Sequence, residues 1–273
     1  MSDSKIYNHD LKLDRALQHF HALEAEVKRW LGQQPYNVMI EFDPHRVENS
    51  VSINVREQPP PEFGLIIGDC LHNLRSALDS LAYDLARACK GEPLPDDIAK
   101  TSEFPIFIDP AKFAEQRERK IGATAPDVQA VIEELQPYHG RNNFASLTSL
   151  IARHRPYAHH PLWLLHELSR RDKHRLPNLT LFAPLQVIYG GHNASFTFPE
   201  PRDATSVKDS AELFSYGPLH TDSDELEVEF YFDCGIAFEE GPPAYGESVL
   251  LVLARLRTYI ISEVVPRLRP FLP

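Results

Sequence analysis

Apolar residues recur every three or four positions between Gly68 and Ala86, and this spacing predicts an amphipathic helix. Because an α-helix advances about 100° per residue, the apolar positions gather on one side as a seam. The seam consists of Leu71, Leu74, Leu78, Leu81, Ala82 and Leu85. Beside it the same geometry places a polar stripe, which we define as Asp69, His72, Arg75 and Asp79. We expect this helix to lie at the centre of the fold, since the preceding segment FGLIIG is apolar on most sides.

The rest of the chain alternates between helical and strand-like patterns. Spacing and proline or glycine breaks predict helices over residues 10–31, around 113, over 128–136, 143–152, 161–176 and 245–272, the last kinked or ended near Pro266. Alternating apolar residues predict a hairpin of strands over 36–42 and 50–57, and further strands over 179–189, 194–200 and 224–240. The polar stretch 202–224 is expected to be a loop.

This order of elements predicts an α+β fold, in which a helical bundle with an N-terminal β-hairpin is followed by an antiparallel sheet and a final helix. We expect residues 1–178 to form the bundle, with the hairpin as an insertion. Residues 179–273 are expected to form the sheet and a C-terminal helix that packs back on the bundle. One continuous domain is the alternative, because that final helix returns to the first part of the chain.

Charge narrows the choice of partners. The chain carries a formal net charge of -11, which argues against a broad basic face for duplex DNA. A local basic cluster is nevertheless present, formed by Arg170, Arg171, Lys173, His174 and Arg175. Because electrostatic attraction depends on clustering, an anionic partner such as RNA or a nucleotide stays open.

The cysteines and the distribution of apolar residues point to a cytoplasmic protein. Three cysteines without a CxxC spacing do not suggest a disulfide framework or a thiolate zinc site. The N-terminal residues contain no apolar signal segment, and no apolar run reaches the length of a membrane span. We therefore expect a protein without a membrane partner, in a reducing compartment.

A second helix supplies a partner for the polar stripe. In PLWLLHELSRRDKHRL, Asp172 shares the apolar side of the helix with Leu165, Leu168 and Leu176. A carboxylate at a core position costs several kcal/mol unless it is paired, so we predict a hydrogen bond from Asp172 to Arg75 or His72. Such a cluster is either a functional site or a buried ion pair that ties two helices together, and the sequence leaves both open.

The segments LHNLRSALD, EFPIF and DKHR together resemble a widespread group of uncharacterised bacterial proteins over roughly residues 10–180. More distantly, an arginine and a histidine near a helix end resemble the HEPN superfamily. That resemblance implies metal-independent RNA cleavage or nucleotide-related binding in stress and defence. It implies His174 or His159 as general acid or base, with Arg170, Arg171 or Arg175 stabilising phosphorane charge. Three residues separate Arg170 from His174, one fewer than the shortest spacing of the HEPN signature.

Two other classes of function compete with this one. Asp69 and His72, with Glu167, Asp172, His166 and His174, offer ligands for iron, manganese or zinc, although Arg75 would repel a cation. A non-catalytic interaction protein is the other alternative, with aromatic strand residues at a pocket or a homodimer face: Phe196, Phe198, Phe230, Tyr231 and Phe232. The common P-loop, GxGxxG, GxSxG and HExxH motifs are absent from the sequence.

The candidate residues fall into two groups, and whether the chain is an enzyme stays open. The catalytic candidates are His72, Arg75, Asp172 and His174. The binding candidates are Asp69, Asp79, Arg170, Arg171 and Arg175. No cofactor and no resident metal are expected.

Overall fold

The chain divides into two compact units in a computed structural model that describes residues 6–41, 49–139, 160–182, 185–189, 196–197, 206–216, 228–232, 234–239 and 243–273. The helical unit combines Met1–Ala22, Leu65–Leu176 and Leu251–Pro273. The sheet unit combines Leu23–Gly64 and Pro177–Leu250. The predicted helix over 143–152 and His159 lie outside the described residues. Segments distant in sequence therefore build each unit, and the fold is α+β as predicted.

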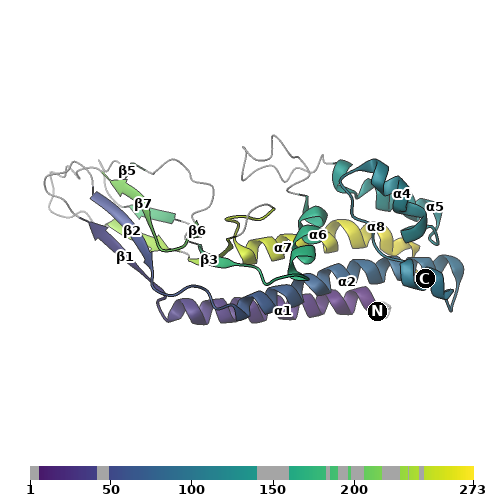
Figure 1. Cartoon of the computed structure of the whole chain (residues 1–273), viewed down its shortest axis with the longest axis horizontal. Coiled ribbons are helices and arrows are strands. Elements are labelled where there is room, and N and C mark those ends of the chain that lie inside the picture. The colour runs from purple at the N-terminus through teal and green to yellow at the C-terminus, as the bar shows by residue number, and fades with distance from the viewer. Residues whose placement is uncertain are drawn as a thin grey trace. The chain divides into compact units, whose positions relative to one another are not determined.

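Long helices dominate the helical unit (Figure 1). In chain order the helices are α1 (Asn8–Gly32), α2 (Glu62–Lys90), α3 (Asp96–Thr101), α4 (Pro110–Ile121), α5 (Pro126–Glu134), the 3-10 turn η1 (Pro137–His139), α6 (Pro161–Asp172) and α7 (Val249–Tyr259). The chain continues from α7 through the π-helical segment η2 (Ile260–Val264) to α8 (Val265–Leu268) and the 3-10 turn η3 (Arg269–Phe271). The predicted final helix is thus present, with a change of hydrogen-bond pattern near Pro266.

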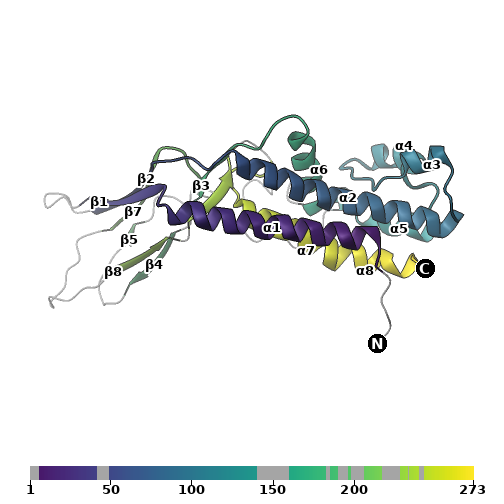
Figure 2. The ribbon, with the colours of Figure 1, turned by 90° about the horizontal axis from the view of Figure 1, so that it is seen from below.

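Three of these helices run side by side (Figure 2). The α1 and α2 helices are antiparallel, since the Cys70 thiol lies 3.5 Å from the Ala16 carbonyl oxygen while His9 lies beside Asp84. Arg269, after α8, bonds to Asp10 near the start of α1. The C-terminal helical segment therefore packs back on the first two helices, as the sequence predicts.

The core of the helical unit contains the predicted apolar seam. All six seam residues of α2 are buried, with exposed fractions of at most 2%. The α2 helix is longer than the predicted core segment, and it begins directly after the proline run that ends at Pro61. The seam thus directs one side of α2 into the core and leaves the polar stripe beside it.

Prolines and capping side chains set the starts of the shorter helices. Pro110, Pro126 and Pro161 each occupy the first turn, where the missing N–H has no intrahelical acceptor. Asp109 caps α4 by accepting a hydrogen bond from the Ala111 N–H at 2.9 Å. The α6 helix ends at Asp172, so the prediction of a helix to residue 176 is wrong there. Pro177 disfavours helical geometry at the residue before it, and the chain leaves the helix earlier still.

The π-helical segment has a physical cause in Pro266. A proline removes one backbone N–H and its ring collides with the carbonyl of the preceding turn. Immediately before it, the Val265 N–H bonds to the Ile260 carbonyl, five residues back, which widens the helix. The chain thus passes the proline without ending its helical course.

All the paired strands in the sheet unit are antiparallel. The strands are β1 (Tyr36–Glu41), β2 (Asn49–Val55), β3 (Leu179–Phe182), β4 (Leu185–Tyr189), β5 (Phe196–Thr197), β6 (Ser206–Val207), β7 (Ser210–Tyr216), β8 (Val228–Phe232) and β9 (Gly235–Phe238). They form sheets in the orders β1-β2-β7-β5, β6-β3-β9 and β4-β8.

Two sequence-based expectations differ from this topology. The stretch 202–224 is not simply a loop, because it contains β6 and β7, and Leu213 of β7 is buried. The hairpin is not an insertion in the bundle, because β2 pairs with β7 over Asn49–Asn54 and thereby joins the later strands. Backbone pairing between distant segments overrides the polar composition of β7.

Two further findings concern the chain as described. Cys70, Cys89 and Cys234 are all free thiols. Within the described residues, none of the helices combines the length and the apolar character needed to cross a bilayer.

Candidate functional site

The structure brings the polar stripe of α2 and the end of α6 into direct contact. A Cβ atom on Gly68 would lie 2.4 Å from Oδ1 of Asp172, closer than any real contact, so the two helices meet where α2 has no side chain. Burial raises the pKa of Asp172 and the Asp69 carboxylate raises it further, whereas His72 acts in the opposite direction. The predicted apposition of these two helices is confirmed.

The predicted bond from Asp172 is wrong. Among the described residues the structure has no hydrogen bond or ion pair between Asp172 and Arg75 or His72, and His72 is exposed. Arg75 follows Gly68 by seven positions, which is about 10 Å along the helix axis. The guanidinium of Arg75 therefore lies too far along α2 for a carboxylate that packs on Gly68.

Arg75 instead holds the EFPIF segment against α2. Its Nη2 donates to Oδ1 of Asp79 at 3.0 Å and to the Phe104 carbonyl at 2.6 Å. The same Asp79 oxygen accepts the Phe104 N–H at 3.0 Å. The other terminal nitrogen of Arg75, Nη1, is buried and has no hydrogen-bond partner among the described residues. Arg75 thus has a fixed orientation and an unused donor.

Arg75 also lines a pocket of about 770 Å³, which we call the basic pocket. The pocket is formed within the helical unit by α2, α4, α6 and the EFPIF segment. It is lined by Arg75, Asp79, Glu103, Phe104, Ile106, Phe107, Ile108, Lys112, Glu115, Gln116, Arg119, Lys120, Trp163, His166, Ser169, Arg170 and Lys173. Six of these residues are lysine or arginine and three are acidic, so the lining has a cationic excess in a chain of net charge -11.

Half of these cations pair with a carboxylate. Arg75 pairs with Asp79, Lys120 with Glu103, and Arg170 with Glu167. By contrast, no ion pair joins Lys112, Arg119 or Lys173 to a carboxylate in the part of the chain that the structure describes, and all three are exposed. The basic pocket therefore offers uncompensated positive charge at its rim.

The electrostatics inside the pocket agree with this excess. Burial lowers the pKa of His166, and Arg75, Arg170 and Lys120 lower it further against the opposing effect of Glu167. Burial also lowers the pKa of Lys120, with Arg75 adding to the effect and Asp79 opposing it. Both groups thus bear a cost for positive charge that an incoming anion would relieve.

Aromatic and hydroxyl groups complete the lining. The His166 ring stacks on Trp163 with centroids 5.7 Å apart, and the Lys120 ammonium lies 5.9 Å from the centre of the Phe107 ring. The Ser169 hydroxyl is buried and has no hydrogen-bond partner among the described residues. A buried polar group without a partner costs free energy, so a ligand that reached Ser169 or Arg75 would make a hydrogen bond that the described residues leave unmade.

Some of the predicted site residues line this pocket and the others do not. Arg75, Asp79 and Arg170 line it. The others, namely Asp69, His72, Arg171, Asp172, His174 and Arg175, are not among its lining residues. His174 is exposed beyond the end of α6. The aromatic strand residues proposed for a pocket or dimer face have side chains outside the described part of the structure.

Sequence reasoning missed Lys120 and the aromatic rings of Trp163 and Phe107, and it named His166 only as a possible metal ligand. The signal available for the cations was their spacing, since Lys112 lies about two turns before Arg119 and Lys120 on α4. Nothing in the sequence alone indicates that α4 faces α6, so this set could not be assembled beforehand. The metal alternative gains no ligand set, since no group of three or more His, Cys, Asp or Glu side chains suited to a metal occurs among the described residues.

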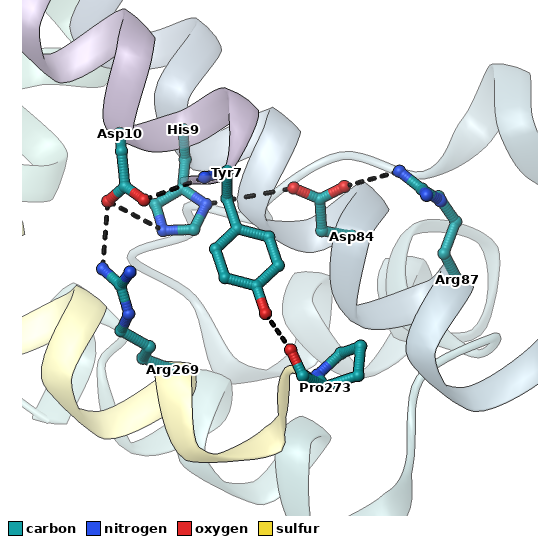
Figure 3. Close-up of polar contacts among 7 residues, drawn as sticks. All are labelled: Tyr7, His9, Asp10, Asp84, Arg87, Arg269 and Pro273. Carbon is teal, nitrogen blue, oxygen red and sulfur yellow. Dashed lines mark hydrogen bonds and ion pairs between the residues drawn. The ribbon is translucent and has the colours of Figure 1, made fainter. Parts of the chain in front are cut away.

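A second polar cluster lies where α1 begins (Figure 3). His9 is fully buried, with Nδ1 3.9 Å from Oδ2 of Asp84 and Nε2 3.5 Å from Oδ1 of Asp10. Arg87 bonds to Asp84 at 3.1 Å, and Arg269 bonds to Asp10 at 3.1 Å. Because these pairs join α1, α2 and the C-terminal segment to one another, we assign this cluster a structural role.

Comparison with known proteins assigns the chain to no family. No family model, no curated protein and no solved structure matches the chain. The likeness to the LHNLRSALD group and to HEPN proteins therefore stays a prediction, and the site has to be interpreted from its own chemistry.

Proposed function

We propose that the helical unit binds the phosphate group of a nucleotide ligand in the basic pocket. The observation that carries the proposal is the Nη1 atom of Arg75, a buried cationic donor without a partner among the described residues. A guanidinium in a fixed orientation suits the geometry of phosphate oxygens. The rim cations Lys112, Arg119 and Lys173 add attraction at longer range.

The aromatic lining favours a nucleotide over a simple inorganic anion. Trp163 and Phe107 both contribute to the pocket walls. Aromatic side chains stack on the faces of nucleobases irrespective of base identity, and such stacking contributes about 1–3 kcal/mol per base. A ligand that combines a phosphate with a planar base would use both the charged and the aromatic parts of the lining.

The proposal concerns binding and does not extend to RNA cleavage. The HEPN resemblance implies an acid–base role for His174, which does not line the basic pocket. His166 lines the pocket, but a histidine can bind an anion without taking part in a reaction. RNA cleavage by His174 would require a reaction site outside the basic pocket.

A charge-reversal pair on α4 tests the proposal. Lys112 and Arg117 are both exposed on this helix, but only Lys112 lines the pocket. We expect 5′-AMP to bind the wild type saturably by calorimetric titration, and Lys112→Glu to weaken binding by about tenfold through like-charge repulsion. Arg117→Glu, with the same change in net charge, should bind as the wild type does.

Two further variants examine Arg75 and Ser169, which carry the donors without partners among the described residues. Arg75→Gln removes the buried cation and should reduce affinity by about tenfold to a hundredfold, the range for a charged hydrogen bond. Ser169→Ala deletes only a hydroxyl and should cost less. Absence of saturable binding to the wild type, or an equal loss in Lys112→Glu and Arg117→Glu, would overturn the proposal.

A further inference from the structure

His166 lies in the basic pocket with both ring nitrogens available. Neither nitrogen has a hydrogen bond to any residue in the described part of the chain. Stacking on Trp163 positions the His166 ring and involves neither ring nitrogen. The charged groups that act on it are Arg75 of α2, Lys120 of α4, and Glu167 and Arg170 of its own helix, α6.

The balance of these charges opposes a proton on His166. Three of the four groups are cations, and the one carboxylate, Glu167, is already bonded to Arg170 at 2.8 Å. Burial is the largest cause of the lowered pKa of His166, because an imidazolium loses hydration in the pocket. An anion placed among these groups would offset their net positive charge and favour the protonated ring.

We propose that the basic pocket selects a terminal phosphate, a phosphomonoester dianion, over an internal phosphodiester, and that His166 takes a proton from solvent when the dianion binds. The inference rests on the proposed function and names the chemical class of its ligand. Above its second pKa of about 6 a monoester carries close to two charges, whereas a diester carries one. The second charge is what stabilises the added proton.

The number of available donors supports the same choice. A terminal phosphate presents three strong acceptor oxygens. Three side chains that line the pocket carry donors suited to them: the Nη1 atom of Arg75, the Ser169 hydroxyl and one nitrogen of protonated His166. A diester has only two such oxygens, so it would leave one of the buried donors without a partner.

Three probes separate the ligand classes. 5′-AMP, 3′,5′-cyclic AMP and adenosine share one base and carry a monoester, a diester and no phosphate. Each probe is titrated into the full chain at about pH 7.5, where the monoester is already a dianion. Any proton taken up on binding is therefore taken up by the protein. We expect 5′-AMP to bind about tenfold more tightly than cyclic AMP, the effect of one charged hydrogen bond, with adenosine weakest.

Calorimetry in two buffers of different ionisation enthalpy measures the proton. We expect 5′-AMP to bind with uptake of a fraction of a proton, and cyclic AMP with less. His166→Gln keeps a polar side chain of similar size that cannot titrate, so uptake should vanish and the preference for the monoester should shrink. His174→Gln, at an exposed histidine outside the pocket, should retain both properties.

The outcomes distinguish the two proposals. If none of the three probes binds, the proposed function fails. If 5′-AMP and cyclic AMP bind equally tightly and without proton uptake, the phosphate site stands and the present inference is overturned. Proton uptake that persists in His166→Gln would also overturn it, because another group would then carry the proton.

Discussion

Gly68 allows α2 to approach α6, because Asp172 occupies the space where a side chain would stand. Glycine within a helix costs about 1 kcal/mol relative to alanine, so its place in a buried helical position points to this close approach. We expect Gly68→Ala to lower the free energy of unfolding by about 1–2 kcal/mol, measured by chemical denaturation. The carboxylate of Asp172 would have to move away from the new methyl group.

Two controls separate this contact from helix propensity. Gly32, at the end of α1, has nothing within 4 Å of its notional Cβ, so Gly32→Ala should leave the free energy of unfolding unchanged or raise it slightly. In the background Asp172→Ala, Gly68→Ala should no longer destabilise. A destabilisation of the same size in that background would mean that Asp172 is not the group displaced.

His160 makes the stability of the helical unit depend on pH. Its Nδ1 accepts the Leu162 N–H at 3.2 Å and caps α6, which leaves the ring proton on Nε2, 3.2 Å from the Tyr259 hydroxyl. Burial lowers the pKa of His160 to about 4. The unfolded chain takes up this proton near pH 6.5, its ordinary pKa, and the folded chain only near pH 4. The stabilisation is therefore complete above about pH 6.5 and is lost as pH falls to about 4.

The loss over that interval should be about 3 kcal/mol in the free energy of unfolding. Denaturation curves between those pH values measure it, and His160→Asn gives the reference. Asparagine caps a helix with a neutral oxygen and does not titrate, so its curve should be flatter than that of the wild type by this amount. Parallel curves for the two proteins would contradict the assignment.

Among the elements, α1 and α2 are joined by the polar cluster around His9. Asp84 has an exposed side-chain fraction of 6% and contacts both His9 and Arg87. We expect Asp84→Ala to lower the free energy of unfolding by about 3 kcal/mol, because removing one partner of a buried pair leaves the others uncompensated. Thermal or urea denaturation measures the change.

An exposed ion pair on α1 provides the matched control. Glu26 and Arg29 pair at the surface, and Glu26→Ala should have no measurable effect on unfolding. If Asp84→Ala proves as harmless as Glu26→Ala, the cluster does not hold α1 against α2.

The same elements show what the sequence can and cannot predict. The seam of α2 follows from its own spacing, because each of its residues faces the core whatever lies opposite. The partner of Arg75 does not follow from this spacing, because the partner depends on where along α2 the Phe104 backbone lies. The strand β7 was missed for a related reason: its polar residues gain their order from pairing with β2, a contact across many residues of sequence. His166 lay within a predicted helix, yet its surroundings come from α2 and α4.

At the scale of the whole molecule, charge distribution decides the function that we propose. The chain is acidic overall, yet one pocket of the helical unit gathers six lysine and arginine side chains. Long-range repulsion from the acidic surface should slow an anion, and the rim cations should offset this locally. Binding of a nucleotide phosphate should therefore weaken as salt is added, since exposed charges are screened within about 10 Å at 0.1 M.

The two tryptophans allow the central claim to be tested directly. Trp163 lines the basic pocket, whereas Trp30 is buried in the sheet unit with an exposed fraction of 4%. In a nitrogen-15 NMR titration with 5′-AMP, the indole N–H signal of Trp163, identified by its loss in Trp163→Phe, should shift saturably while that of Trp30 stays in place. If the Trp163 signal stays in place, or if both signals move together, a nucleotide does not bind in the basic pocket.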